Sequence, residues 1–191
     1  MSNSATTTSA GKRERLLESA KGLIHEQGAH RTTLAEVAER ADVPLGNVYY
    51  YFKTKDELVA AVIERYKEQA EVLIRSLERH RSPQARLKAL IKNWADMRET
   101  VARYGCPMGT LCAELDKLES GTDREAAAVL AVIIDWTEEQ FRELGRRDAR
   151  DLALALFAGI QGAALLANTF RDPTILTRQS RHLERSIDLL T

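Results

Sequence analysis

The chain has 191 residues, and its 28 basic Lys and Arg side chains are balanced by 28 acidic Asp and Glu side chains. This balance excludes a protein that coats DNA by charge alone, because such a protein would be strongly basic. Hydrophobic residues make up 44% of the sequence, without a run long enough to span a bilayer, so we expect a soluble globular protein with no membrane partner. Two cysteines and no secretory signal predict free thiols in the reducing cytoplasm.

Hydrophobic periodicity predicts nine helices and no strand, which makes the fold class all-α. Residues 1–11 are expected to form a disordered tail, with an arm in the DNA minor groove as the alternative. Capping boxes or proline starts, such as Thr33 with Glu36, and terminal glycines, such as Gly28, mark the helix ends. The expected helices cover about residues 12–27, 34–41, 45–51, 55–78, 83–104, 108–118, 123–144, 149–170 and 174–190.

Residues 33–58 contain two short helices joined by a tight turn, and the second helix carries three tyrosines followed by Lys53 and Lys55. A short helix with this composition suits a phosphate backbone better than a core. The pattern is typical of a helix-turn-helix, whose second helix lies in the DNA major groove. Val48 and Phe52 are four residues apart, so we expect them to share the inward face of that helix.

Several residues of this segment are candidates for DNA contact, each with a structural alternative. Tyr49 and Tyr50 can bind phosphate through their hydroxyls or pack on the protein surface. Asn47 can pair with adenine or cap the helix. Thr33 stands where a helix N-terminus offers N–H groups to phosphate. Lys55 lies in the first turn of a helix, where a cation is better explained by an outside anion than by the helix dipole.

The sequence from Ala41 to Lys55, ADVPLGNVYYYFKTK, resembles the TetR (tetracycline-repressor-like) family of transcriptional regulators. The resemblance is close over about residues 12–60 and extends to the rest of the chain only in layout. Asp42 replaces a frequent turn glycine, and Leu45 replaces a frequent lysine, so the operator sequence cannot be inherited from relatives. By position, the resemblance implies DNA contacts at Thr33, Pro44, Leu45, Gly46, Asn47, Tyr49, Tyr50 and Lys55.

The resemblance also implies a homodimer formed through the last two helices, and the residues support this independently. Residues 149–170 are apolar on nearly all sides, and small side chains there permit close approach of helices. Two helices from each subunit would form a four-helix bundle, which would hold two recognition helices about 34 Å apart on a palindrome. The candidate interface residues are Ala155, Gly159, Gly162, Ala163, Leu183 and Ile187.

Residues 104–115, YGCPMGTLCAEL, interrupt helix continuity beside large apolar side chains, which suggests a cavity for a small molecule. Plain core packing is the alternative for each residue. Cys106 could sense electrophiles if a helix N-terminus lowers its pKa, or could simply be a small residue at a helix start. The candidate effector-binding residues are Trp94, Met97, Met108, Leu111, Cys112, Trp136, Phe157 and Gln161.

We therefore expect a DNA-binding domain at residues 12–58 and a ligand-binding and dimerisation domain at 59–191. The leading hypothesis is a dimeric transcriptional repressor that binds a palindromic operator in double-stranded DNA and is released by a small apolar or amphipathic effector. One alternative is a helical small-molecule or thiol-based sensor or enzyme with a vestigial head; another is an activator. We recognise no catalytic set, metal-ligand spacing or cofactor motif.

Overall fold

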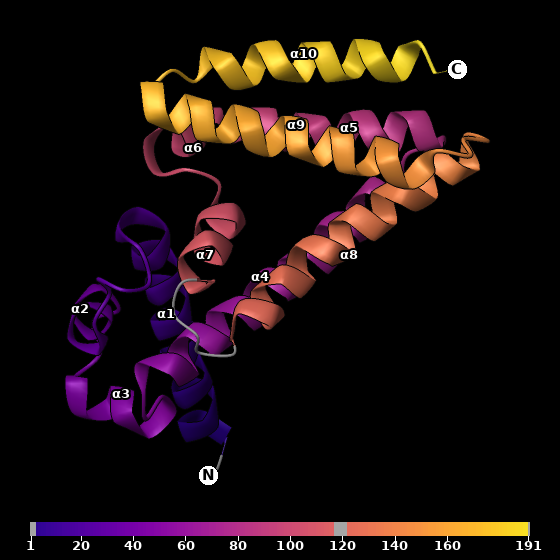
Figure 1. The fold of residues 1–191 in the computed structure, drawn as a ribbon. Coiled ribbons are helices and arrows are strands. Elements are labelled where there is room, and N and C mark those ends of the chain that lie inside the picture. Colours follow the sequence, from indigo (N-terminus) through magenta and orange to yellow (C-terminus); the bar gives the residue numbers. More distant parts are fainter. Residues whose placement is uncertain (1–2, 117–121, 191) are drawn as a thin grey trace. The chain divides into compact units, whose positions relative to one another are not determined.

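The computed structural model describes residues 3–116 and 122–190, with side chains from residue 11 onward, and these residues form helices and no strand (Figure 1). The all-α fold class is therefore confirmed. The helices are α1 (Asn3–Gln27), α2 (Leu34–Arg40), α3 (Leu45–Tyr51), α4 (Lys55–Leu77), α5 (Pro83–Asp96), α6 (Arg98–Tyr104), α7 (Pro107–Leu115), α8 (Thr122–Glu143), α9 (Ala149–Phe170) and α10 (Thr174–Asp188).

Several helix bounds differ from expectation. The helix expected over 108–118 is α7, which ends at Leu115, and residues 117 and 118 lie outside the described part of the chain. The helix expected over 83–104 is divided at Met97 into α5 and α6, which raises the number of described helices from nine to ten. Helix α1 begins at Asn3 rather than near residue 12, so it overlaps the tail expected over residues 1–11.

The chain forms two compact units. Unit 1 comprises Met1–Tyr66 and Thr110–Ala126, and unit 2 comprises Lys67–Gly109 and Ala127–Thr191. The first boundary falls inside α4, near the end of the expected DNA-binding domain. Unit 1 is nevertheless larger than that domain, because it also contains residues 110–126.

Unit 1 has an apolar core to which α1, α2, α3 and α4 each contribute one face. The spacing of three or four residues places these side chains on one stripe of each helix, as an amphipathic helix requires. The buried residues include Leu16, Ala20 and Ile24 of α1, Val37 and Ala38 of α2, Val48 of α3, and Leu58, Val59 and Val62 of α4.

The turn between α2 and α3 depends on Asp42, which adopts the left-handed conformation with φ at 51°. The N–H of Asp42 donates to the Glu39 carbonyl at 3.1 Å, and the N–H of Val43 donates to the Ala38 carbonyl at 3.0 Å. These two bonds form a Schellman motif, in which glycine is the usual left-handed residue. Aspartate tolerates this conformation better than most residues, as expected from the sequence.

Unit 2 contains α5, α6, α9 and α10, and α10 packs against both α9 and α5. Its core includes Leu87, Leu90, Ile91 and Trp94 of α5, and Ala153, Leu156, Phe157, Ile160, Ala164 and Ala167 of α9. Helix α9 is long and apolar enough to span a membrane by length and composition alone. Its inner face, which includes Ala153, Leu156 and Ile160, is buried in unit 2.

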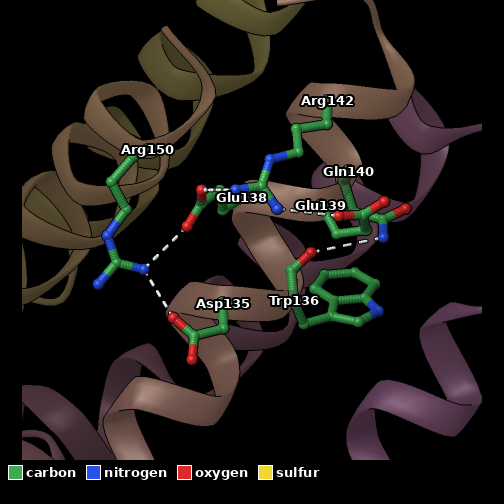
Figure 2. Close-up of polar contacts among 7 residues, drawn as sticks. All are labelled: Asp135, Trp136, Glu138, Glu139, Gln140, Arg142 and Arg150. Carbon is green, nitrogen blue, oxygen red and sulfur yellow. Dashed lines mark hydrogen bonds and ion pairs between the residues drawn. The ribbon is translucent and has the colours of Figure 1, made fainter. Parts of the chain in front are cut away.

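A network of ion pairs joins α8 to the first turn of α9 (Figure 2). The Arg150 guanidinium lies 2.6 Å from the Asp135 carboxylate and 3.0 Å from that of Glu138. Glu138 also pairs with Arg142, so one carboxylate serves two cations. Glu138 is the least exposed member of this set, and a shared, partly buried carboxylate contributes more than an isolated surface pair.

We expect residue 42 to govern the stability of unit 1 through its backbone conformation. Asp42→Val should lower the free energy of unfolding by about 1–2 kcal/mol, because a β-branched side chain disfavours the left-handed region. Asp42→Gly and Asp42→Asn should leave it unchanged or raise it, since both residues accept that conformation. Urea unfolding of the three variants provides the measurement, and equal stability of the valine and glycine variants would contradict it.

Candidate nucleic-acid interface

Helix α3 is anchored on one side and open on the other. Val48 is 0% exposed and Phe52 is 2% exposed, so these two residues fix the helix against the core of unit 1 as expected. On the opposite side Tyr49 is 52% exposed and Tyr50 is 80% exposed. Leu45, at the first position of the helix, is also exposed. The arrangement presents two phenol hydroxyls and one aliphatic side chain to a partner.

The N-terminal turn of α3 has open space beside Gly46, and the side-chain amide of Asn47 is available there. A Cβ atom on Gly46 would meet nothing within 4 Å, so folding does not require a glycine there. The N-cap of α3 is the exposed Pro44, which makes no side-chain cap, so Asn47 does not cap the helix. The Asn47 side chain is half-buried, and within the described residues no partner takes its amide.

Thr33 forms the expected capping box at the start of α2. Its hydroxyl accepts the Glu36 N–H at 3.2 Å, and its own N–H donates to the Glu36 carboxylate at 2.8 Å. The Thr33 hydroxyl, then its N–H, and then the Gln27 amide hydrogen-bond to Glu36 and lower the pKa of its carboxyl group. A phosphate at this position would therefore compete with an intramolecular carboxylate.

Lys55 already has a partner within its own unit. Its ammonium group donates to the backbone carbonyl of His30 at 2.6 Å, which ties the first residue of α4 to the turn between α1 and α2. The exposed cation at this end of the recognition helix is Lys53, whose side chain forms no ion pair within the described part of the chain. The sequence marked both lysines, but nothing in it distinguished the tied one from the exposed one.

The neutral charge count hides an uneven distribution. Three acidic residues of α1 are paired with basic residues of the same unit: Glu14 with Arg65, Glu18 with Lys21, and Glu26 with Arg40. Arg40 binds both oxygens of Glu26 at 2.7 Å. These pairs neutralise acids on the α1 side, and residues 43–53 contain one base, Lys53, and no acid.

Within unit 2, the candidate effector residues combine aromatic packing with unused polar groups. The rings of Trp94 and Phe157 meet edge to face, with centroids 5.9 Å apart. One helical turn further along α9, the Gln161 amide donates to the Cys106 sulfur at 3.4 Å. Met97 and Met108 pack on the buried cluster that includes Cys106.

Both tryptophan indole N–H groups, of Trp94 and Trp136, are buried without a hydrogen-bond partner among the described residues. Plain core residues rarely leave such donors unpaired. The other two candidates, Leu111 and Cys112, belong to unit 1, where Leu111 is buried and Cys112 is half-buried.

The candidate dimer residues fall into two groups. Ala155 and Gly162 are exposed on α9, whereas Ala163 and Ile187 are buried inside unit 2. Gly159 makes room for side chains of its own chain, because a Cβ there would lie 2.8 Å from the Gln179 amide nitrogen and 3.4 Å from Leu183. Some small residues of α9 therefore allow α10 to pack closely, and others lie on the outer surface of the helix.

The outer surface of α9 also carries large apolar side chains that the sequence analysis did not select. They are Leu154, Leu165, Leu166 and Phe170, with exposed fractions of 43%, 67%, 48% and 66%. Their spacing, with Ala158 and Gly162 between them, forms one continuous stripe along the helix. The described residues contain no group of three or more His, Cys, Asp or Glu side chains able to hold a metal ion.

Comparisons with known proteins agree with this geometry. Residues 16–62 match the family model for bacterial regulatory proteins of the tetR family, and residues 83–182 match the model "Transcriptional regulator LmrA/YxaF-like, C-terminal domain". An uncharacterized HTH-type transcriptional regulator of Mycobacterium tuberculosis is 31% identical over 188 residues, covering 91% of this chain and 94% of that protein. A similar regulator of Lactococcus lactis is 29% identical, covering 93% of this chain and 90% of its own.

Solved structures show the same fold. A TetR-family regulator from Agrobacterium tumefaciens matches with a TM-score of 0.84 at 22% identity, covering 93% of this chain and 98% of that one. The regulatory protein TetR from Rhodobacter sphaeroides matches with a TM-score of 0.80 at 27% identity, covering 90% and 96%. Because family models match residues 16–62 and 83–182 and a relative is 31% identical over nearly its whole length, the chain belongs to the TetR family of transcriptional regulators, which are DNA-binding proteins and not enzymes.

Proposed function

We propose that the protein is a ligand-responsive repressor that binds a palindromic operator as a homodimer in the cytoplasm. A small apolar or amphipathic effector bound to its larger unit releases it from DNA. The observation that carries this proposal is the orientation of α3, whose inward Val48 and Phe52 leave Tyr49 and Tyr50 directed to solvent.

The proposed DNA contacts are of two kinds. Tyr49, Tyr50 and Lys53 supply hydroxyl and ammonium donors to phosphate, which fix the register of the head on the duplex. Leu45 and Asn47 can reach base edges, the leucine through a thymine methyl and the asparagine through adenine. Pro44 and Gly46 expose the backbone for close approach. Thr33 and Lys55 are also proposed contacts. A phosphate at these positions would have to share the Thr33 N–H with Glu36 and the Lys55 ammonium group with the His30 carbonyl.

The proposed dimer interface is the apolar stripe of α9, with Ala155 and Gly162 as the small residues that allow close approach. Four large apolar side chains exposed in one row favour burial, at about 25 cal/mol for each Å² removed from water. Because α10 packs along α9, two helices from each subunit would meet in a four-helix bundle. A two-fold pair of heads then matches a palindrome.

The proposed effector site lies in unit 2 around Trp94, Phe157 and Gln161. Met97, Met108 and Trp136 belong to the same unit. The unpaired indole N–H groups support an effector with at least one acceptor oxygen. An effector switches the protein to the extent that it binds the released state more tightly than the DNA-bound state.

The alternative is a thiol-based sensor or an enzyme with a vestigial head. Cys106 is 4% exposed and its sulfur accepts a hydrogen bond from Gln161, which gives a reagent little access. An activator would use the same surfaces, and a reporter gene would distinguish it from a repressor. The first alternative has a direct test, because a vestigial head would not bind DNA even at low salt.

The DNA-binding proposal is tested by fluorescence anisotropy on duplex DNA from the region upstream of the gene. Tyr49→Phe and Tyr50→Phe should each weaken binding about fivefold per subunit, the value of one lost hydrogen bond. Lys53→Ala should lower the slope of log affinity against log salt by about one per subunit. Lys92→Ala is the matched control, because Lys92 pairs with Asp96 in unit 2. Wild-type affinity in all three head variants, or no binding by the wild type, would count against the proposal.

The dimer proposal is tested by sedimentation of Leu165→Glu. A charge in the middle of the stripe should raise the dimer dissociation constant by about thirtyfold or more, corresponding to loss of a hot spot of about 2 kcal/mol. Val72→Glu places the same charge at an exposed apolar residue of α4 and should leave the dimer intact. A dimer that survives the α9 substitution would refute this interface.

The effector proposal is tested through fluorescence, because both tryptophans of the chain lie in unit 2. A compound that releases DNA should change tryptophan emission. Trp94→Phe keeps an aromatic ring beside Phe157 but removes the indole N–H. The variant should therefore bind that compound about fivefold more weakly. Release of DNA by compounds that leave the emission of both tryptophans unchanged would place the effector elsewhere.

A further inference from the structure

The turn between α1 and α2 in unit 1 is held by two charged side chains that are distant in sequence. The Glu114 carboxylate, near the end of α7, accepts the backbone N–H of Ala29 at 2.8 Å and the N–H of His30. From the other side, the Lys55 ammonium donates to the His30 carbonyl at 2.6 Å. The His30 residue is therefore bound through both its backbone donor and its backbone acceptor.

The local backbone is shaped for this contact. Helix α1 ends at Gln27, and Gly28 has a φ of 90°, which directs the next two N–H groups away from the helix. A Cβ on Gly28 would lie 3.0 Å from one Glu114 oxygen, so the carboxylate approaches the bare backbone closely. The Thr32 hydroxyl closes the turn by donating to the Gly28 carbonyl at 2.8 Å.

The turn has a packed side and an open side. Ala29 is 1% exposed and Thr32 is 2% exposed, while a pocket of about 280 Å³, lined in part by His30, Lys55 and Asp56, lies beside the turn. The polar bonds of the turn act in addition to this packing. Hydrogen bonds in which one partner carries a charge are about twice as strong as neutral ones, and here both the acid and the base are charged.

The position of this turn determines where the DNA-reading elements begin. Thr33, three residues after His30, caps α2. The Schellman motif at Asp42 connects α2 to α3 with a fixed backbone conformation. The residues that grip the turn come from α4 and α7, and each of these helices has residues in both units. Helix α7 starts at Pro107, next to Cys106, whose sulfur accepts the Gln161 amide.

We propose that Glu114 and Lys55 are paired positioning residues that clamp the Ala29–His30 turn and hold α2 and α3 in the orientation that binds DNA. This inference rests on the proposed function. It assigns Lys55 an action through the protein backbone in addition to any contact with phosphate.

The clamp itself is tested by hydrogen exchange on the full-length protein, without DNA. Glu114→Gln keeps the size of the side chain but removes its charge, and it offers one acceptor oxygen instead of two. The amides of Ala29 and His30 should exchange at least tenfold faster in this variant. Asp116→Asn is the matched control, because it removes the same charge from an exposed residue two positions away and should change neither amide. Unchanged exchange in Glu114→Gln would overturn the clamp.

The effect on DNA binding is tested by a double-mutant cycle with the same upstream duplex. Glu114→Gln and Lys55→Met should each weaken binding about fivefold. The double variant should bind little more weakly than the more affected single variant, because both side chains hold the backbone of the same residue, His30. Additive losses, or wild-type affinity in Glu114→Gln, would overturn the positioning role.

The thermal midpoint of each variant separates a general loss of folding from this specific coupling, since a variant that merely unfolds loses affinity and midpoint together. If the wild type does not bind the duplex, the proposed function fails. The exchange of the Ala29 and His30 amides then still decides whether the clamp exists.

Discussion

The anchoring of α3 by Val48 and Phe52 is the interaction on which the proposed DNA-contact surface depends. A helix of seven residues has almost no stability of its own, because nucleation is unfavourable and few backbone bonds follow it. Burial of these two side chains, one helical turn apart, supplies that stability and fixes the rotation of the helix about its axis. The two neighbouring tyrosines can then point only to solvent. The proposed DNA-contact surface is thus a consequence of core packing beneath it.

Helix caps, helix ends and turns were predictable from the sequence because they depend on neighbouring residues. The capping box of Thr33 and Glu36, the helix ends at Gly28 and Gly145, and the left-handed Asp42 all follow from local chemistry. The break at Met97 was not predictable, because no proline or glycine marks it. Its cap is an ordinary residue whose conformation depends on its tertiary surroundings.

Long-range partners could not be read from the chain. Glu114 binds N–H groups that are 85 and 84 residues away, and its own surroundings in the sequence give no sign of a distant backbone partner. The same limit applied to Lys55, whose charge suggested an outside anion while a carbonyl of the same unit lies within reach. The small residues of α9 suggested a dimer interface, but Gly159 makes room for side chains of α10 in its own chain. That three leucines of α9 are exposed could not be predicted from the sequence, because it depends on which face of α9 packs against the rest of unit 2.

The open space around Gly46 has an evolutionary consequence. Any of the common side chains could be introduced there without disturbing the packing of the head, since no atom lies within reach of a new Cβ. If Gly46 lies against DNA as proposed, substitutions there would be filtered by their effect on base preference and hardly at all by folding. Divergence in the DNA sequence that descendants of this protein read could then begin at that residue with little loss of stability.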